Sequence, residues 1–160
     1  MREVVQHGGG AVMAAVFPDN DVLLIRQFRY PVQRRIIELP AGKLDAGEDP
    51  LLCARRELEE ETGWRAGRVE HLVSMLTTPG FCSEVLHIYL AQDLELGTQS
   101  LEQGEESIEV LRTPLIEAID MCRRGDIVDG KTVTGLMLAG MKLGVLQPGD
   151  AEHLPMEGKQ

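Results

Sequence analysis

Three glutamates of this sequence, Glu57, Glu60 and Glu61, stand at positions i, i+3 and i+4 of a predicted helix and would share one of its faces. Carboxylates crowded on one face repel one another unless a cation lies between them. Oxygen-only ligands suit Mg²⁺ or Mn²⁺, which also bind phosphate groups. Glu48 can join this shell, and Arg56 is expected to neutralise and orient one carboxylate. The spacing indicates a metal site, although most runs of glutamate are solvated acidic faces.

The helix that carries these glutamates is predicted over residues 50–62 from its end signals. Asp49 suits the N-cap, and Pro50 suits the first helical position, where its missing N–H costs nothing. Gly63 suits the left-handed residue that ends a helix. The chain therefore presents the glutamates on one well-delimited helix.

A longer pattern surrounds this helix: Gly, five residues, Glu, seven residues, then Arg-Glu-apolar-x-Glu-Glu-x-Gly-apolar. This order matches the Nudix box, and the chain resembles the Nudix hydrolase superfamily, which cleaves nucleoside diphosphates linked to another group. The resemblance implies an α+β fold, a Nudix-type α/β/α sandwich with a mixed β-sheet. The matching positions are Gly42, Glu48, Arg56, Glu57, Leu58, Glu60, Glu61, Gly63 and Trp64.

Other stretches resemble one branch of the superfamily, the ADP-ribose pyrophosphatases. Residues 24–29 end in Gln-aromatic-Arg, and residues 38–42 match the branch's approach to the box. Residues 78–84 resemble its Ser/Thr-Pro-Gly loop closed by Glu, and Pro79 follows Trp64 by 15 residues. The resemblance implies Mg²⁺-dependent hydrolysis of ADP-ribose to AMP and ribose 5-phosphate. Alternatives are another nucleotide sugar, an oxidised nucleotide, or a non-catalytic module that senses ADP-ribose.

The same resemblance implies roles for individual residues. The Ala41 carbonyl and the carboxylates of Glu57 and Glu61 would bind metal, with Glu60 and Glu48 in or near the shell; Glu60 and Arg56 also count among the catalytic residues. The general base would be Glu105 or Glu106, unless that segment is a solvated acidic loop. The expected substrate contacts are Gln27, Arg29, Glu38, Pro79, Gly80 and Glu84.

Simpler interpretations of three of these features stay open. Arg29, expected to hold a phosphate or the terminal ribose, could be a surface arginine. Glu84 could only cap its loop, and Pro79-Gly80 could be no more than a tight turn. His7, beside three glycines, could serve the site or belong to a mobile N-terminus.

Length and composition bound the remaining function classes. The 160 residues fit one domain, expected over residues 1–146 and followed by a flexible tail over 147–160. The net charge of −10 argues against duplex nucleic acid as a partner. No apolar run reaches about 18 residues, so no membrane partner is expected. Three cysteines without a zinc pattern indicate reduced thiols and a cytoplasmic protein.

Branch members usually carry an N-terminal β-subdomain ahead of the region that begins here with Val4. That subdomain serves dimer formation and adenine binding, and a homodimer is still expected. Strands are expected over 11–17 and 22–29, paired as a hairpin, and over 35–39, 67–77, 85–92 and 109–112. Further helices are expected over 113–125 and 131–146, although glycines weaken the second of these.

Overall fold

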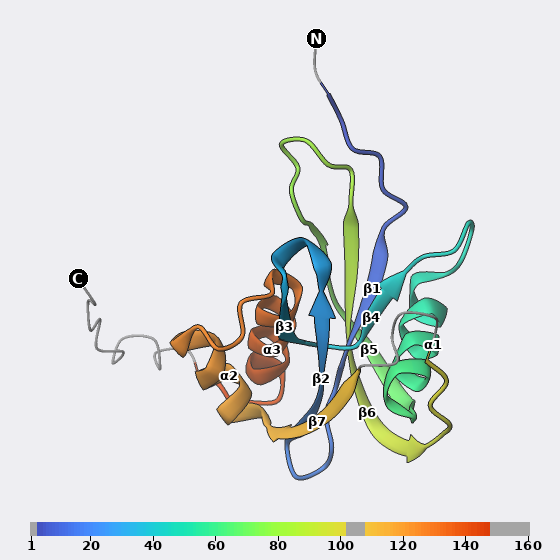
Figure 1. Cartoon of the computed structure of the whole chain (residues 1–160). Coiled ribbons are helices and arrows are strands. Elements are labelled where there is room, and N and C mark those ends of the chain that lie inside the picture. Colours follow the sequence, from blue (N-terminus) through green and yellow to red (C-terminus); the bar gives the residue numbers. More distant parts are fainter. Residues whose placement is uncertain (1–2, 102–107, 148–160) are drawn as a thin grey trace, which may run out of the picture.

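The computed structural model describes residues 3–101 and 108–147, which form two β-sheets and three α-helices (Figure 1). Each expected element is present, together with a short strand, β4, where the sequence predicts a loop. In chain order the elements are β1 (Gly10–Ala15), β2 (Asp21–Arg29), the 3-10 helix η1 (Tyr30–Val32), β3 (Arg34–Glu38), β4 (Ala41–Lys43), α1 (Pro50–Thr62), β5 (Trp64–Leu76), β6 (Val85–Leu96), β7 (Glu109–Pro114), α2 (Leu115–Arg124) and α3 (Gly130–Lys142).

The mixed sheet contains four strands in the order β4-β1-β6-β5. Strand β1 runs parallel to β6 and antiparallel to β4, and β5 is antiparallel to β6. The other sheet has the order β3-β2-β7 and is antiparallel throughout. The expected mixed sheet is confirmed, but the strands divide between two sheets rather than forming one.

The prediction that residues 11–17 and 22–29 pair as a hairpin is wrong. The chain does reverse between them, where Asn20 has a φ of 64°. Only an isolated bridge between Val16 and Val22 joins the two segments. Both edges of β1 are already paired, with β4 and β6, so β2 pairs with β3 and β7 in the other sheet. The turn residues determine that the chain reverses between β1 and β2, but they do not determine which strands pair.

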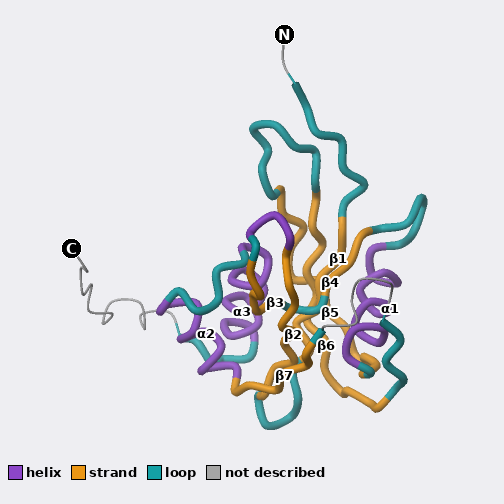
Figure 2. The backbone as a smooth tube through the Cα atoms, in the orientation of Figure 1, coloured by secondary structure: helices purple, strands orange, loops and turns teal. Residues whose placement is uncertain are grey.

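The side chains of β1 alternate between two hydrophobic cores, because neighbouring residues of a strand point to opposite faces. Val12 and Ala14 belong to the core that α2 and α3 cover, whereas Ala11 and Met13 belong to the core that α1 covers. Helix α1 and the pair α2–α3 lie on opposite sides of the strands (Figure 2). This arrangement confirms the expected α/β/α sandwich.

Helix α3 has glycines where it packs closely against other elements. A Cβ on Gly135 would lie 2.5 Å from Cδ1 of Leu39. Buried Thr132 fastens the same helix to the end of β3, since its Oγ1 accepts the Leu39 N–H (2.9 Å). The helix ends at Lys142, whereas the sequence predicts continuation to residue 146. No helix in the described ranges has the length and apolar composition that a membrane crossing requires.

Gly135→Ala is expected to lower the free energy of unfolding by about 1–2 kcal/mol, since overpacking against Leu39 outweighs the gain in helix propensity. Gly130→Ala is the matched control on the same helix, because a Cβ there meets no atom within 4 Å. This control should raise the free energy of unfolding by at most about 1 kcal/mol. Urea unfolding of both variants measures the difference, and equal stability would contradict the close contact.

Candidate active site

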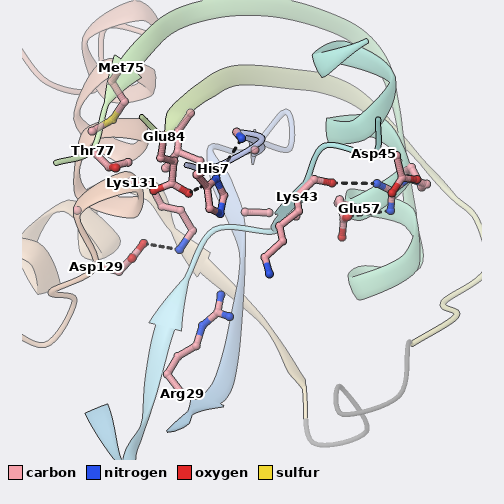
Figure 3. A pocket seen from close by; sticks show the side chains of 17 residues that line it. His7, Arg29, Lys43, Asp45, Glu57, Met75, Thr77, Glu84, Asp129 and Lys131 are labelled. Atoms are coloured by element: carbon pink, nitrogen blue, oxygen red, sulfur yellow. Dashed lines mark hydrogen bonds and ion pairs between the residues drawn. The ribbon is translucent and has the colours of Figure 1, made fainter. Parts of the chain in front are cut away.

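A pocket of about 780 Å³ opens between the N-terminal segment, the β4–α1 connection, the ends of β5 and β6, and the start of α3 (Figure 3). Helix α1 supplies Arg56 and Glu57 on one wall, and the start of α3 supplies Lys131 on the facing wall. The titratable side chains that line the pocket are His7, Arg29, Lys43, Asp45, Arg56, Glu57, Glu84, Asp129 and Lys131.

The acidic wall forms where the backbone of β4 passes close to α1. A Cβ on Gly42 would lie 1.8 Å from Oε1 of Glu57, so a side chain here would displace the carboxylate from its present position. Gly10 of β1 is constrained in turn, because a Cβ there would lie 2.8 Å from the Gly42 carbonyl oxygen. Ala41 N–H donates to Oε2 of Glu61 (2.9 Å), a carboxylate that is only 1% exposed. Two glutamates of α1 are thus held directly against β4.

Arg56 gathers three of the predicted metal-binding carboxylates. Its Nε and Nη2 donate to Glu48 (3.1 and 3.2 Å), and its Nη1 donates to Glu57 (2.7 Å) and Glu60 (3.0 Å). The hydrogen bonds from Arg56 lower the pKa of Glu48 from 4.5 to about 2. The sequence predicts that Arg56 neutralises one carboxylate, whereas the structure shows contacts with three.

The three carboxylates that Arg56 contacts fit a hard divalent cation by type, because their ligand atoms are oxygens. Among the described residues, no three acidic, histidine or cysteine side chains surround a common point as metal ligands would. Arg56 instead supplies the positive charge, and an incoming metal ion would compete with its N–H donors. Metal binding therefore stays a prediction for Ala41, Glu48, Glu57, Glu60 and Glu61.

A buried carboxylate, Glu38, joins two cations on the facing wall. Glu38 is 1% exposed and accepts from Arg29 through both oxygens (2.9 and 3.0 Å) and from Lys131 Nζ (2.5 Å). Lys131 also donates to Asp129 (2.9 Å). Arg29, Asp129 and Lys131 line the pocket, but Glu38 does not. Glu38 therefore positions Arg29 and Lys131, and its predicted contact with the substrate stays a prediction.

The other predicted substrate contacts separate into two groups. Glu84 lines the pocket, where its Oε1 lies 3.3 Å from Nδ1 of His7. His7 thus belongs to the pocket rather than to a mobile N-terminus, since its Nδ1 also accepts a backbone N–H. Gln27 is buried and does not line the pocket, and Pro79 and Gly80 are exposed in the β5–β6 loop outside it.

Some pocket residues carry no signal in the sequence. The spacing of residues along the chain does not relate the start of α3 to the Nudix box. The only local signal at the start of α3 is Asp129, a residue type that is favoured at the N-cap of a helix. Both candidates for the general base, Glu105 and Glu106, lie outside the described residues. The charged lining side chains that sequence reasoning missed are Lys43, Asp45, Asp129 and Lys131.

Known proteins share this sequence and fold. The family model of the NUDIX domain matches residues 8–134. An ADP-ribose pyrophosphatase of Bacillus subtilis (strain 168) is 37% identical over 142 residues, which cover 88% of this chain and 77% of the relative. A GDP-mannose pyrophosphatase of Salmonella paratyphi B is 37% identical over 141 residues, which cover 82% of this chain and 73% of the relative.

A solved structure, described as an ADP compounds hydrolase, has a TM-score of 0.77 at 25% identity. The match covers 86% of this chain and 73% of the solved chain. The fold therefore agrees with the family indicated by the sequence match. Since the domain match spans most of the sequence and includes the whole box, the chain belongs to the NUDIX family.

Proposed function

We propose that this chain hydrolyses ADP-ribose to AMP and ribose 5-phosphate with a divalent metal ion. The observation that carries the proposal is the Glu57 carboxylate, which the Gly42 backbone approaches closely at the wall of the pocket. Glu48 and Glu60 form ion pairs with the guanidinium of Arg56, which also contacts Glu57. Such a cluster of oxygen ligands suits a hard cation that also binds a diphosphate. The similarity to an ADP-ribose pyrophosphatase supports the substrate.

Hydrolases of the NUDIX family generally need divalent metal ions, and we propose Mg²⁺ for this chain, with Mn²⁺ as the alternative. The Ala41 carbonyl and the carboxylates of Glu57 and Glu61 would hold the ion, with Glu48 and Glu60 in or near the shell. When bound, such an ion stabilises charge on the diphosphate and lowers the pKa of a coordinated water. Before binding, the role of Arg56 is to hold the three carboxylates together.

Other residues of the pocket would bind the substrate and move a proton. Arg29 keeps donors beyond the two that Glu38 uses, and it lines the pocket, so it would hold a phosphate or the terminal ribose. Glu84 would contact the substrate or a water molecule. Glu105 or Glu106 would take the proton of the water that attacks phosphorus. The net reaction consumes one water and one ADP-ribose.

A second candidate substrate is GDP-mannose, because a GDP-mannose pyrophosphatase has the same 37% identity to this chain as the ADP-ribose enzyme, over a smaller share of it. A sensing module without activity has weaker support, because all the specified positions of the box are present, from Gly42 to Trp64. The homodimer and the cytoplasmic location expected from the sequence stay predictions.

Glu57→Gln is expected to lower kcat by about a hundredfold or more, since a neutral amide is a poorer ligand for the cation that stabilises the transition state. Glu59→Gln is the matched control on the same helix, because Glu59 bonds Arg65 and lies outside the pocket. Initial rates at saturating ADP-ribose and Mg²⁺ measure the effect, and thermal unfolding checks that both variants fold. An unchanged kcat in Glu57→Gln would remove this residue from the mechanism.

A substrate panel tests the specificity. Purified protein with Mg²⁺ should show its highest kcat/KM with ADP-ribose among ADP-ribose, ADP-glucose, GDP-mannose and 8-oxo-dGTP, and EDTA should abolish turnover. AMP and ribose 5-phosphate should form in equal amounts, because one phosphorus–oxygen bond breaks per turnover. A preference for GDP-mannose would overturn the proposed substrate, and turnover of none of the four would overturn the proposed activity.

A further inference from the structure

The wall of the pocket that faces α1 carries a donor and an acceptor side by side. Asp129 and Lys131, at the start of α3, both line the pocket (Figure 3). Their side chains are only 18% and 12% exposed. Neither residue belongs to the box or to the predicted substrate contacts. Their position within the same pocket as Glu57 makes them candidates for the part of a substrate that lies beyond the metal-binding wall.

Asp129 keeps one carboxylate oxygen for a ligand. Its Oδ2 accepts three hydrogen bonds, from Thr132 N–H (3.0 Å), Thr132 Oγ1 (2.6 Å) and Lys131 Nζ (2.9 Å). Its Oδ1 accepts none from the residues that the structure describes. Because Oδ2 is the helix cap, the carboxylate cannot turn without losing the cap. Oδ1 is therefore an acceptor fixed in orientation at the pocket wall.

Lys131 keeps a donor beside this acceptor. An ammonium has three protons, and Lys131 directs two of them to Glu38 (2.5 Å) and Asp129 (2.9 Å). The third proton has no acceptor among the described residues. Since Glu38 and Asp129 hold the ammonium from two directions, its position is also fixed. The two residues together offer one acceptor and one donor.

The charge of this wall favours a neutral ligand over a phosphate. Arg29 and Lys131 carry two positive charges, and Glu38 and Asp129 carry two negative charges, so the group is neutral. Lys43 lines the pocket on β4 and forms no ion pair within the described parts of the chain, so it is better suited to an anion. A hydroxyl can donate to a carboxylate and accept from an ammonium at the same time. Two adjacent hydroxyls of a sugar ring match this pairing.

We infer that Asp129 and Lys131 bind a vicinal pair of hydroxyls on a sugar of the substrate. One hydroxyl donates to Oδ1 of Asp129, and its partner accepts from Nζ of Lys131, while the diphosphate lies toward Glu57 and Lys43. This inference rests on the proposed function. It adds the pair of protein side chains that selects among diphosphates according to the sugar they carry. Glu38 and Thr132 act as positioning residues, because each holds one member of the pair.

Asp129→Asn tests the acceptor without removing the helix cap, because asparagine caps as well as aspartate. The amide oxygen keeps the bonds of Oδ2, and the amide N–H₂ replaces the free acceptor with a donor. KM for ADP-ribose should rise by about tenfold or more, the loss expected for one hydrogen bond to a charged group. The kcat should not change, because the contact is remote from the phosphorus. Lys131→Met should act in the same direction.

Lys142→Met is the matched control for Lys131→Met. Lys142 lies at the other end of α3, bonds Glu70 on the surface and lies outside the pocket. Its KM should equal that of the unmodified chain. Matching thermal midpoints of all variants exclude loss of folding. A KM for Asp129→Asn equal to that of the control would overturn the inference.

Two analogues identify the sugar. The ethyl ester of ADP lacks the second sugar, and 2′,3′-dideoxyadenosine diphosphoribose lacks the hydroxyl pair of the nucleoside. With one of these two substrates, Asp129→Asn should leave KM unchanged, because the hydroxyls that Asp129 would contact are missing. The sugar that this substrate lacks, or whose hydroxyls it lacks, is then the one that Asp129 and Lys131 bind. An equal rise in KM with ADP-ribose and both analogues would show a purely structural effect and overturn the inference.

Binding separates this inference from the proposed function. If the unmodified chain turns over none of these substrates, the proposed function fails. Calorimetry with Mg²⁺ and the non-hydrolysable α,β-methylene analogue of ADP-ribose then measures Kd directly. A Kd about tenfold higher for Asp129→Asn supports the hydroxyl contact without any turnover. Equal Kd values, or no binding to the unmodified chain, would overturn it.

Discussion

The candidate site depends on the close approach between the backbone of β4 and the carboxylates of α1. Gly42 brings the chain against Glu57 where any side chain would collide with the carboxylate, and Ala41 N–H holds the buried carboxylate of Glu61. Strand β4 is in turn fixed by pairing with β1, which is buried in the centre of the molecule. The buried strand β1 thereby holds β4 in place, and β4 in turn positions the glutamates of α1 at the pocket. Precise placement of this kind is what metal and phosphate chemistry requires.

Charge balance governs both walls of the pocket. On the α1 side, Arg56 compensates three glutamates that would otherwise repel one another, and it holds them together. On the α3 side, buried Glu38 is compensated by Arg29 and Lys131. A buried charge that loses its partner is strongly destabilising, so such networks fix their members in place. The pocket consequently combines an acidic wall that suits a cation with a neutral, polar wall that suits hydroxyls.

The sequence predictions were accurate where the interactions join residues close together in the chain, and less accurate where they join distant ones. The ends of α1 were predictable because Asp49, Pro50 and Gly63 act within one turn of the helix. The reversal near Asn20 was equally local, but the pairing of the strands around it was not, because β1 is paired with β4 and β6 instead. Gln27, Pro79 and Gly80 stand in motifs of the right order, yet they lie outside the pocket. Order along the chain does not determine which way a side chain faces.

The sequence by itself determined the family, the caps and length of the central helix, and the glutamates that make a metal site credible. These features are local or follow a fixed spacing. Only the tertiary structure decided that His7 belongs to the pocket and that Asp129 and Lys131 form its facing wall. Residues so far apart in the chain meet only because the sheets and α3 pack around β1. No periodicity or spacing encodes such a meeting, since it depends on how whole elements pack together.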